Sequence, residues 1–186
     1  MQRTWRQAVA LAVLVVAGAG SLAAQREPMV GGQAMYPSKD IIDNAVNSAD
    51  HTTLVAAVKA ADLVGTLKGK GPFTVFAPTN AAFKLLPDGT VETLLKPENK
   101  GMLTSVLTYH VVPGRYDAKA LMDLIHKGHG QASLKTVNGA NLTFVMNGDR
   151  NIIVKDAKGS QANIAVYDVY QSNGVILVID KVLLPA

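Results

Sequence analysis

Cysteine is absent from all 186 residues of the sequence. The fold therefore holds together without disulfide bonds, and both a thiol nucleophile and a bacterial lipid anchor on cysteine are excluded. Tryptophan is scarce too, because Trp5 is the one such residue and it lies close to the N-terminus. A chain of this length still buries enough apolar surface to form a core, and 48% of its residues are hydrophobic.

Motifs of the common enzyme classes are missing as well. The sequence has no Gly-x-Ser-x-Gly elbow and no dinucleotide fingerprint, and Gly69-Lys70-Gly71 lacks the spacing of a P-loop. His126 and His129 are three residues apart, but Gly128 and Gly130 interrupt a helix there and no third ligand is nearby. We therefore predict a protein that is not an enzyme, with no catalytic residues, no metal and no cofactor.

The N-terminal residues have the pattern of a secretory signal peptide. Arg3 and Arg6 precede an almost wholly apolar run over residues 8–19, and small residues occupy the first and third positions of residues 21–23. This run is too short to span a bilayer comfortably, and no later stretch reaches the ~18 apolar residues of a membrane helix. We expect residues 1–24 to be a signal peptide, the alternative being an uncleaved anchor. The protein is then exported to the periplasm, the cell surface or the extracellular medium.

Positive charge is only slightly in excess. The chain has 18 Lys and Arg residues against 14 Asp and Glu residues. Loss of Arg3 and Arg6 with the signal peptide leaves 16 minus 14, a net charge of +2. The remaining basic residues are scattered, with Lys68 and Lys70 the nearest to a cluster. Nucleic acid binding requires a basic stripe, so it is not expected.

The rest of the chain is predicted to be one α+β domain over residues 36–186, after a flexible lead over residues 25–35. Helical spacing of apolar residues dominates the first half, and short apolar runs separated by Asn-Gly turns dominate the second. The pattern predicts the following elements: a helix after Ser38, a helix from Asp50 to Gly65, a strand over residues 73–77, a helix from Asp117 to near Gly128, and a hairpin at Asn138-Gly139. Helices followed by antiparallel strands indicate an α+β fold or a β-sandwich with helical decoration.

Three segments in order resemble the fasciclin (FAS1) domain family. Residues 71–83 read GPFTVFAPTNAAF, residues 107–114 read LTYHVVPG, and residues 172–185 read SNGVILVIDKVLLP. They are similar to the first box, the central Tyr-His motif and the closing box of that family. The resemblance implies a FAS1-type sandwich or wedge of mainly antiparallel strands with N-terminal and inserted helices, in a secreted single-domain member of bacterial type. The family usually has His where Leu177 stands, and we expect this leucine to pack in the core.

Most residues of these boxes are expected to be structural. The set comprises Phe76, Pro78, Thr79, Asn80, Asn173, Gly174 and Asp180. The Tyr109-His110 pair has two interpretations. The resemblance implies a possible adhesion surface at this pair, whereas the residues themselves favour a partly buried histidine that holds a helix-to-strand transition.

The sequence leads to two main functional hypotheses. The first is an exported, monomeric, non-catalytic binding or cell-adhesion module, whose partner is a cell-surface, matrix or extracellular protein or polysaccharide. The alternative is a carrier or sensor of a small apolar ligand, held in a pocket between the helices and the sheet. An unrecognised hydrolase is disfavoured because no catalytic constellation is visible.

Overall fold

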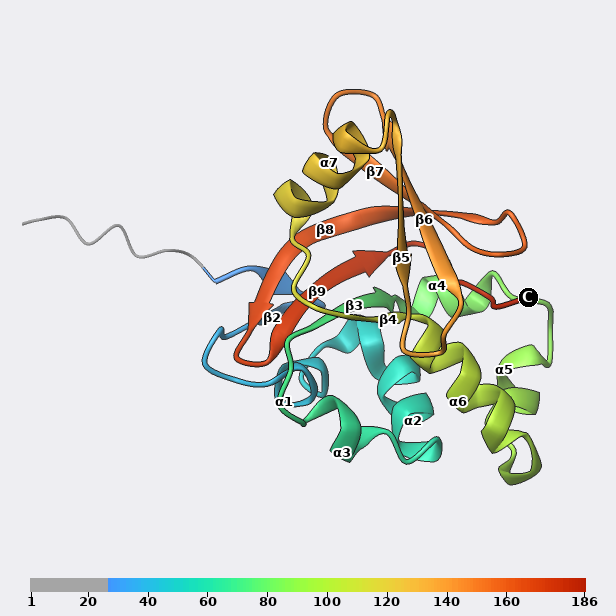
Figure 1. The fold of residues 1–186 in the computed structure, drawn as a ribbon. Helices are drawn as coiled ribbons and strands as arrows, with labels where there is room; N and C mark the ends of the chain where they lie inside the picture. The colour runs from blue at the N-terminus through green and yellow to red at the C-terminus, as the bar shows by residue number, and fades with distance from the viewer. Residues whose placement is uncertain (1–26) are drawn as a thin grey trace, which may run out of the picture.

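The computed structural model describes residues 27–186, and its first elements form a short hairpin (Figure 1). Strands β1 (Met29–Val30) and β2 (Gln33–Ala34) pair across Gly31 and Gly32, whose φ angles are 59° and 76°. Val30 and Met35 are buried against the domain. The hairpin lies within residues 25–35, which the sequence predicted to be a flexible lead, and its two glycines form a tight turn. The predicted signal peptide, residues 1–24, lies outside the described residues.

A seven-stranded sheet forms the centre of the molecule, in the order β4-β3-β9-β8-β7-β6-β5. Its strands are β3 (Phe73–Pro78), β4 (Val111–Pro113), β5 (Gln131–Lys135), β6 (Asn141–Asn147), β7 (Asn151–Lys155), β8 (Gln161–Gln171) and β9 (Gly174–Ile179). Within this sheet β3 and β9 pair in parallel, with Phe73 opposite Gly174, and the other neighbours are antiparallel. The predicted α+β fold of mainly antiparallel strands is confirmed.

Strand β8 bends the sheet into a wedge. Its pairing with β9 shifts register twice, between Ile164 and Val166 and between Val166 and Val169. Such bulges increase the local twist and bend the bulged strand. The sheet therefore folds over so that β5, β6 and β7 stand at an angle to β3 and β9 (Figure 1). The two ends of the sheet approach each other, and the Val137 N–H donates to the Val111 carbonyl at 2.8 Å.

The helices divide between the two sides of the wedge. Most of them lie below β3 and β9 in Figure 1, whereas α7 packs against β5 and β6 above. The α-helices are α1 (Ile41–Ala45), α2 (Thr52–Ala60), α3 (Val64–Leu67), α4 (Asn80–Lys84), α5 (Thr90–Leu94), α6 (Lys100–Tyr109) and α7 (Ala118–Lys127), with 3-10 turns at Ala49–His51 and Pro97–Asn99.

Two apolar clusters lie on the two faces of the β3–β9 layer. Strand β9 is buried along its whole length. Its residues Ile176 and Val178 belong to the cluster beneath the helices, while Leu177 and Ile179 belong to the cluster under α7. Side chains of a strand alternate between faces, so an unbroken apolar run is what a strand covered on both sides requires. The expectation that Leu177 packs in the core is confirmed, since it is fully buried.

Local predictions succeeded in some elements and were wrong in others. The predicted strand is β3, and the predicted helix from Asp117 is α7, whose first turn Asp117 caps through the Ala120 N–H at 2.8 Å. The helix predicted after Ser38 begins at Ile41 with Asp40 as its cap. The helix predicted from Asp50 to Gly65 is wrong at both ends: α2 runs from Thr52 to Ala60, and Gly65 lies within α3.

Candidate functional site

The Tyr109-His110 pair lies where α6 ends and β4 begins. The Tyr109 side chain is fully buried and His110 is 3% exposed. This is the helix-to-strand transition that the sequence predicted. The prediction that the two residues bind a partner directly is not favoured by these positions, because neither side chain reaches the surface of the described residues.

The two ring nitrogens of His110 make different hydrogen bonds. Nδ1 lies 2.8 Å from the carbonyl oxygen of Val106, one turn earlier in α6, and Nε2 lies 3.0 Å from the backbone nitrogen of Leu183. A carbonyl only accepts and an N–H only donates, so Nδ1 carries the proton and Nε2 accepts. The imidazole is therefore neutral, and burial lowers the pKa of His110 from 6.5 to about 4. It connects α6 to the C-terminal segment.

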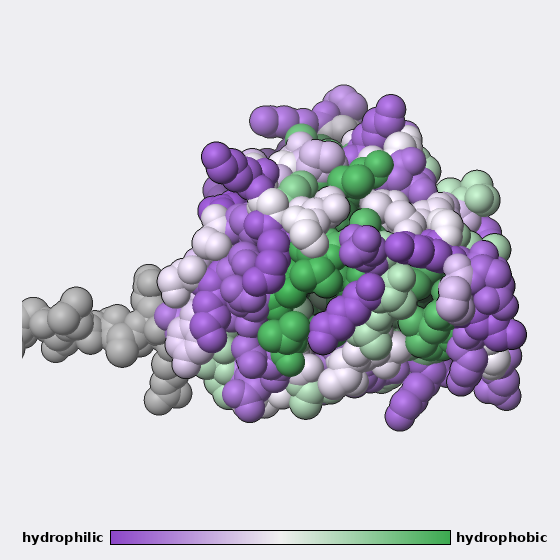
Figure 2. Space-filling model, turned by 90° about the horizontal axis from the view of Figure 1, so that it is seen from below, coloured by the Kyte–Doolittle hydropathy of each residue, from purple (hydrophilic) through white to green (hydrophobic). Residues whose placement is uncertain are grey.

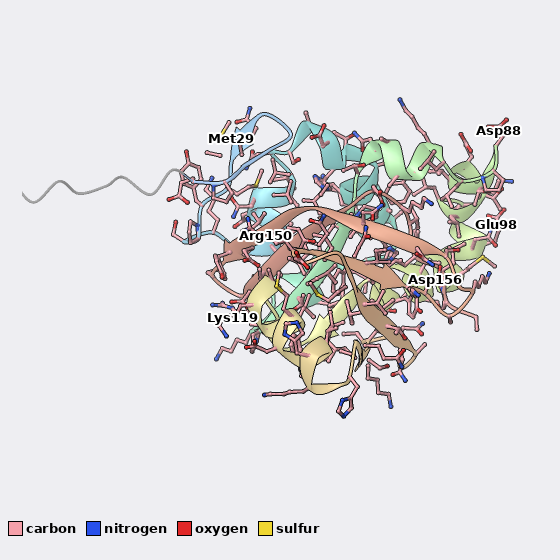
Figure 3. The ribbon with its side chains drawn as sticks, turned by 90° about the horizontal axis from the view of Figure 1, so that it is seen from above. Met29, Asp88, Glu98, Lys119, Arg150 and Asp156 are labelled. Carbon is pink, nitrogen blue, oxygen red and sulfur yellow. The ribbon has the colours of Figure 1, made fainter. Side chains whose placement is uncertain are left out.

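The Tyr109 hydroxyl connects α6 to two strands. It donates to the carbonyl of Asn141 at 2.9 Å and accepts from the backbone nitrogen of Ala157 at 2.9 Å. Burial raises the pKa of Tyr109, so the hydroxyl keeps its proton. Asp156, labelled in Figure 3, extends this contact because its carboxylate accepts from the Leu184 backbone nitrogen at 3.0 Å. The Tyr-His motif thus joins three distant segments through backbone groups.

The first box places its polar residues at helix starts. Thr79 caps α4 by accepting from the Ala82 backbone nitrogen at 3.2 Å. The Asn80 amide caps a different helix: it accepts from the Thr53 nitrogen of α2 at 2.9 Å and donates to the Ala49 carbonyl at 2.8 Å. Helix starts leave free N–H groups, so both contacts stabilise the fold.

The apolar residues of the same box form the strand that precedes these caps. Pro78 is the buried last residue of β3. The fully buried Phe76 faces Phe144 with ring centroids 5.4 Å apart. Their positions are those of core residues.

The closing box joins β9 to its surroundings. The Asn173 side chain accepts from the Ile41 nitrogen at 3.1 Å and donates to the Leu67 and Gly69 carbonyls at 2.7 and 3.1 Å. The Asp180 carboxylate accepts from the Asn163 backbone nitrogen and from its side-chain nitrogen, both at 2.8 Å. Asp180 thus fixes the end of β9 against β8.

Beneath the sheet is an apolar cavity of about 120 Å³. It is lined by α1, α2, α3 and the end of α6, and by β3, β4 and β9. Hydrophobic side chains gather around a hollow on this face of the molecule, with hydrophilic residues beside it (Figure 2). The lining residues are Ile41, Ile42, Ala45, Leu54, Val55, Val58, Lys59, Leu63, Val64, Thr66, Leu67, Phe73, Val75, Ala77, Leu107, Thr108, His110, Val111, Val137 and Ile176. The site has the composition of a pocket for an apolar ligand.

An open polar groove of about 510 Å³ lies near Asn173. It is lined by the loop over residues 68–72, by Asp40, by Arg115 and by the turn at Ser172 and Asn173. Lys68 on this groove is paired with Asp43 at 2.6 Å and with Asp40 at 3.6 Å. Lys70 and Arg115 form no ion pair with any residue from 27 to 186.

Comparison with known proteins assigns the family. The model of the fasciclin domain matches residues 49–185 of the chain. The protein belongs to the fasciclin family. It is 44% identical over 178 residues to protein sll1483 of a Synechocystis species, covering 95% of this chain and 90% of that protein. It is 34% identical over 177 residues to the cell surface glycolipoprotein MPB83 of Mycobacterium bovis, covering 92% and 72%.

The fold agrees with that of a solved fasciclin protein. A FAS1 domain pair from the insect cell adhesion molecule fasciclin I superposes with a TM-score of 0.70 at 18% sequence identity. The match covers 78% of this chain and 51% of the other, so this chain spans about half the length of that domain pair. At this identity the likeness concerns the fold.

Two further properties of this fasciclin domain concern metals and membranes. Within residues 27–186, no three His, Cys, Asp or Glu side chains gather closely enough to hold a metal ion. His126 and His129 lie at the end of α7, where Gly128 ends the helix as expected. No helix in the described part of the chain combines the length and the apolar character that crossing a membrane demands.

The sequence predicted the structural residues of the fasciclin boxes but missed the lining of the two pockets. The cavity draws on seven separate elements, and the groove joins residues as far apart as Asp40 and Asn173. Lys59 and Arg115 carry no local signal that distinguishes them from other exposed basic residues. The three-dimensional arrangement alone brings them to these sites.

Proposed function

We propose that the protein is an exported, non-catalytic binding module of the adhesion type, whose partner is a cell-surface, matrix or extracellular protein or polysaccharide. Family membership supports this proposal, as does the relative that is described as a cell surface glycolipoprotein. The solved structure that shares the fold comes from a cell adhesion molecule. Export rests on the signal peptide expected over residues 1–24.

The observation that carries the proposal is the polar groove at the loop over residues 68–72. Lys70 and Arg115 are exposed and have no acidic partner within the described residues. Arg115 is oriented by a hydrogen bond from its guanidinium to the Gln171 carbonyl at 3.2 Å. Two unpaired cations beside an open groove suit a partner that presents acidic groups. Tyr109 and His110 then support binding by holding the fold.

The test compares two variants that lose the same charge. The chain from residue 25 to 186 is used to capture partners from an extract of its own cell envelope. The double variant Lys70→Gln/Arg115→Gln is expected to lose the partner, whereas Lys135→Gln/Arg150→Gln, two exposed residues elsewhere, is expected to keep it. Thermal melting checks that both fold. Equal capture by both variants would remove the groove from the proposal, and no capture by the wild type would count against the adhesion function.

A second candidate function is a carrier or sensor of a small apolar ligand, and the cavity beneath the sheet favours it. An engineered apolar cavity of about 150 Å³ stays dry and binds benzene, so a cavity of about 120 Å³ is of a useful size. Native mass spectrometry of the protein from its own host tests this directly. A bound apolar compound is expected, and a protein without one after gentle purification would count against it.

A further inference from the structure

The walls of the apolar cavity, as the described residues form them, present almost no polar surface to a ligand. The Thr108 hydroxyl donates to the Thr104 carbonyl at 2.7 Å, within its own helix. Both ring nitrogens of His110 are occupied by Val106 and Leu183. Because a buried polar group without a partner is costly, the part of a ligand that enters this cavity must be hydrocarbon.

The rim of the cavity is chemically different from its walls. Three lining residues, Lys59, Thr66 and Val137, are exposed, so they mark where the cavity meets solvent. Among residues 27–186, Lys59 is the one residue with a charged side chain that lines the cavity. A lysine lays its aliphatic stem on apolar surface and keeps its ammonium in water, which is what this position requires.

Lys59 has no acidic partner in the described part of the chain. Lys68, Lys100 and Lys119 each pair with an aspartate, within 2.6 to 4.0 Å. The acid nearest to Lys59 in the following sequence, Asp62, pairs with Lys100 at 4.0 Å. An unpaired cation at the opening of a hydrocarbon pocket is complementary to a ligand with an anionic head and an apolar body.

We propose that the cavity binds the hydrocarbon end of a small carboxylic acid, whose carboxylate pairs with Lys59 at the rim. The proposal rests on the second candidate function and adds the class of ligand. The inserted part is about as large as a six-membered ring or a short alkyl chain, as the volume of about 120 Å³ allows. Any remaining chain lies along the rim beside Val137.

Three eight-carbon compounds test the head group while the chain stays the same. Octanoate, octanol and octylamine are titrated into the protein at low salt, and binding is followed by calorimetry and by NMR shifts of cavity residues. Octanoate is expected to bind about two- to fivefold more tightly than octanol, the range of an exposed ion pair, and octylamine most weakly. High salt is expected to reduce the preference for octanoate.

Variants of Lys59 separate the two parts of the proposal. Lys59→Gln is expected to bind octanoate and octanol equally, and Lys59→Glu to prefer octylamine, whereas Lys84→Gln, an exposed lysine on α4, behaves as wild type. A preference for octanoate that survives in Lys59→Gln overturns the role of Lys59. Equal binding of all three compounds by the wild type overturns the proposal that the ligand is a carboxylic acid, but it still supports an apolar binding pocket. Absence of binding by all three overturns the second candidate function as well.

Discussion

His110 is a neutral buried histidine whose two nitrogens connect α6 to the C-terminal segment. Burial lowers its pKa to about 4, whereas the unfolded chain has the ordinary value of 6.5. Between these two pH values the unfolded state takes up a proton that the folded state does not. The stabilisation is therefore complete above about pH 6.5 and is lost as the pH falls towards 4, by about 3 kcal/mol in total. Burial also lowers the pKa of His51, which acts in the same direction.

The first prediction concerns His110→Gln, which replaces the imidazole by an amide that does not titrate. We expect the free energy of unfolding to fall by about 1–3 kcal/mol at neutral pH, and to depend less on pH between about 6.5 and 4 than in the wild type. Urea unfolding at a series of pH values measures both effects. His126→Gln, an exposed histidine, is the control and should keep the slope of the wild type. A slope in His110→Gln as steep as in the wild type would contradict the assignment.

Asn173 satisfies three backbone groups with one side chain, and this leads to the second prediction. Asn173→Ala leaves the Ile41 nitrogen and the Leu67 and Gly69 carbonyls without these bonds, so it should cost about 2–3 kcal/mol. Asn173→Asp keeps an acceptor for Ile41 but directs a negative charge at two carbonyls. Compared with the wild type at the same pH, this variant should therefore lose less stability near pH 4 than near pH 7. Chemical denaturation at both pH values measures this, with the exposed Ser172→Ala as a neutral control.

The elements of the fold were predicted well where their signals are local. The helix α7 has its capping Asp117 and its terminal Gly128 within the element itself. The hairpin of β5 and β6 was also predicted, but its loop spans residues 136–140 instead of a two-residue turn. The reason is tertiary, since Val137 and Asn138 in this loop bond to Val111 and Ser105 on the neighbouring strand and helix.

The beginning of α2 shows why another element boundary was missed. The Thr53 nitrogen of α2 is capped by Asn80, whereas the Ile41 nitrogen of α1 bonds to Asn173 in addition to the local cap of that helix by Asp40. A cap that is distant in the sequence leaves no trace beside the helix that it serves. Sequence periodicity finds such a helix without finding where it starts. The resemblance to the fasciclin boxes marked both asparagines as structural and left open what they hold.

The pairing of β3 with β9 provides the third prediction, at the scale of an element. Gly174 lies opposite Phe73, and a Cβ atom at Gly174 would stand 2.3 Å from the Phe73 carbonyl oxygen. Gly174→Ala must therefore push the two parallel strands apart at the start of their pairing. We expect a loss of about 1–3 kcal/mol in stability, the usual cost of overpacking. Hydrogen exchange of the Gly174→Ala variant should be faster in β3 and β9 than in β6 and β7. Equal protection of the two strand pairs would contradict this prediction.

At the scale of the whole molecule, one layer of strands separates two apolar cores that differ in how completely they are packed. The cluster under α7 contains many fully buried side chains, including Leu142, Phe144 and Val154. The cluster beneath the helices encloses the cavity of about 120 Å³. The sequence predicted both the apolar strands and the helices over them, and it raised a pocket between the layers as an alternative. It does not reveal which layer is incompletely filled, because packing depends on how four short helices lie against the sheet.

The last prediction adds one methylene group to each core. Val58 lines the cavity, so Val58→Ile places the new atom in empty space and should raise the stability by up to about 0.8 kcal/mol. Val154 is fully buried in the other cluster, where the same change has no room and should cost about 1 kcal/mol or more. Urea unfolding of both variants measures whether each change raises or lowers the stability. A loss of stability in Val58→Ile would contradict the presence of empty space at this position.

If the cavity is a binding site, Val58→Ile should also weaken the binding of octanol and of octanoate to the same extent, while Val154→Ile should leave the binding of both compounds unchanged. A fasciclin domain that gains stability and loses its ligand through the same methylene would show that the space beneath its sheet is kept open for function.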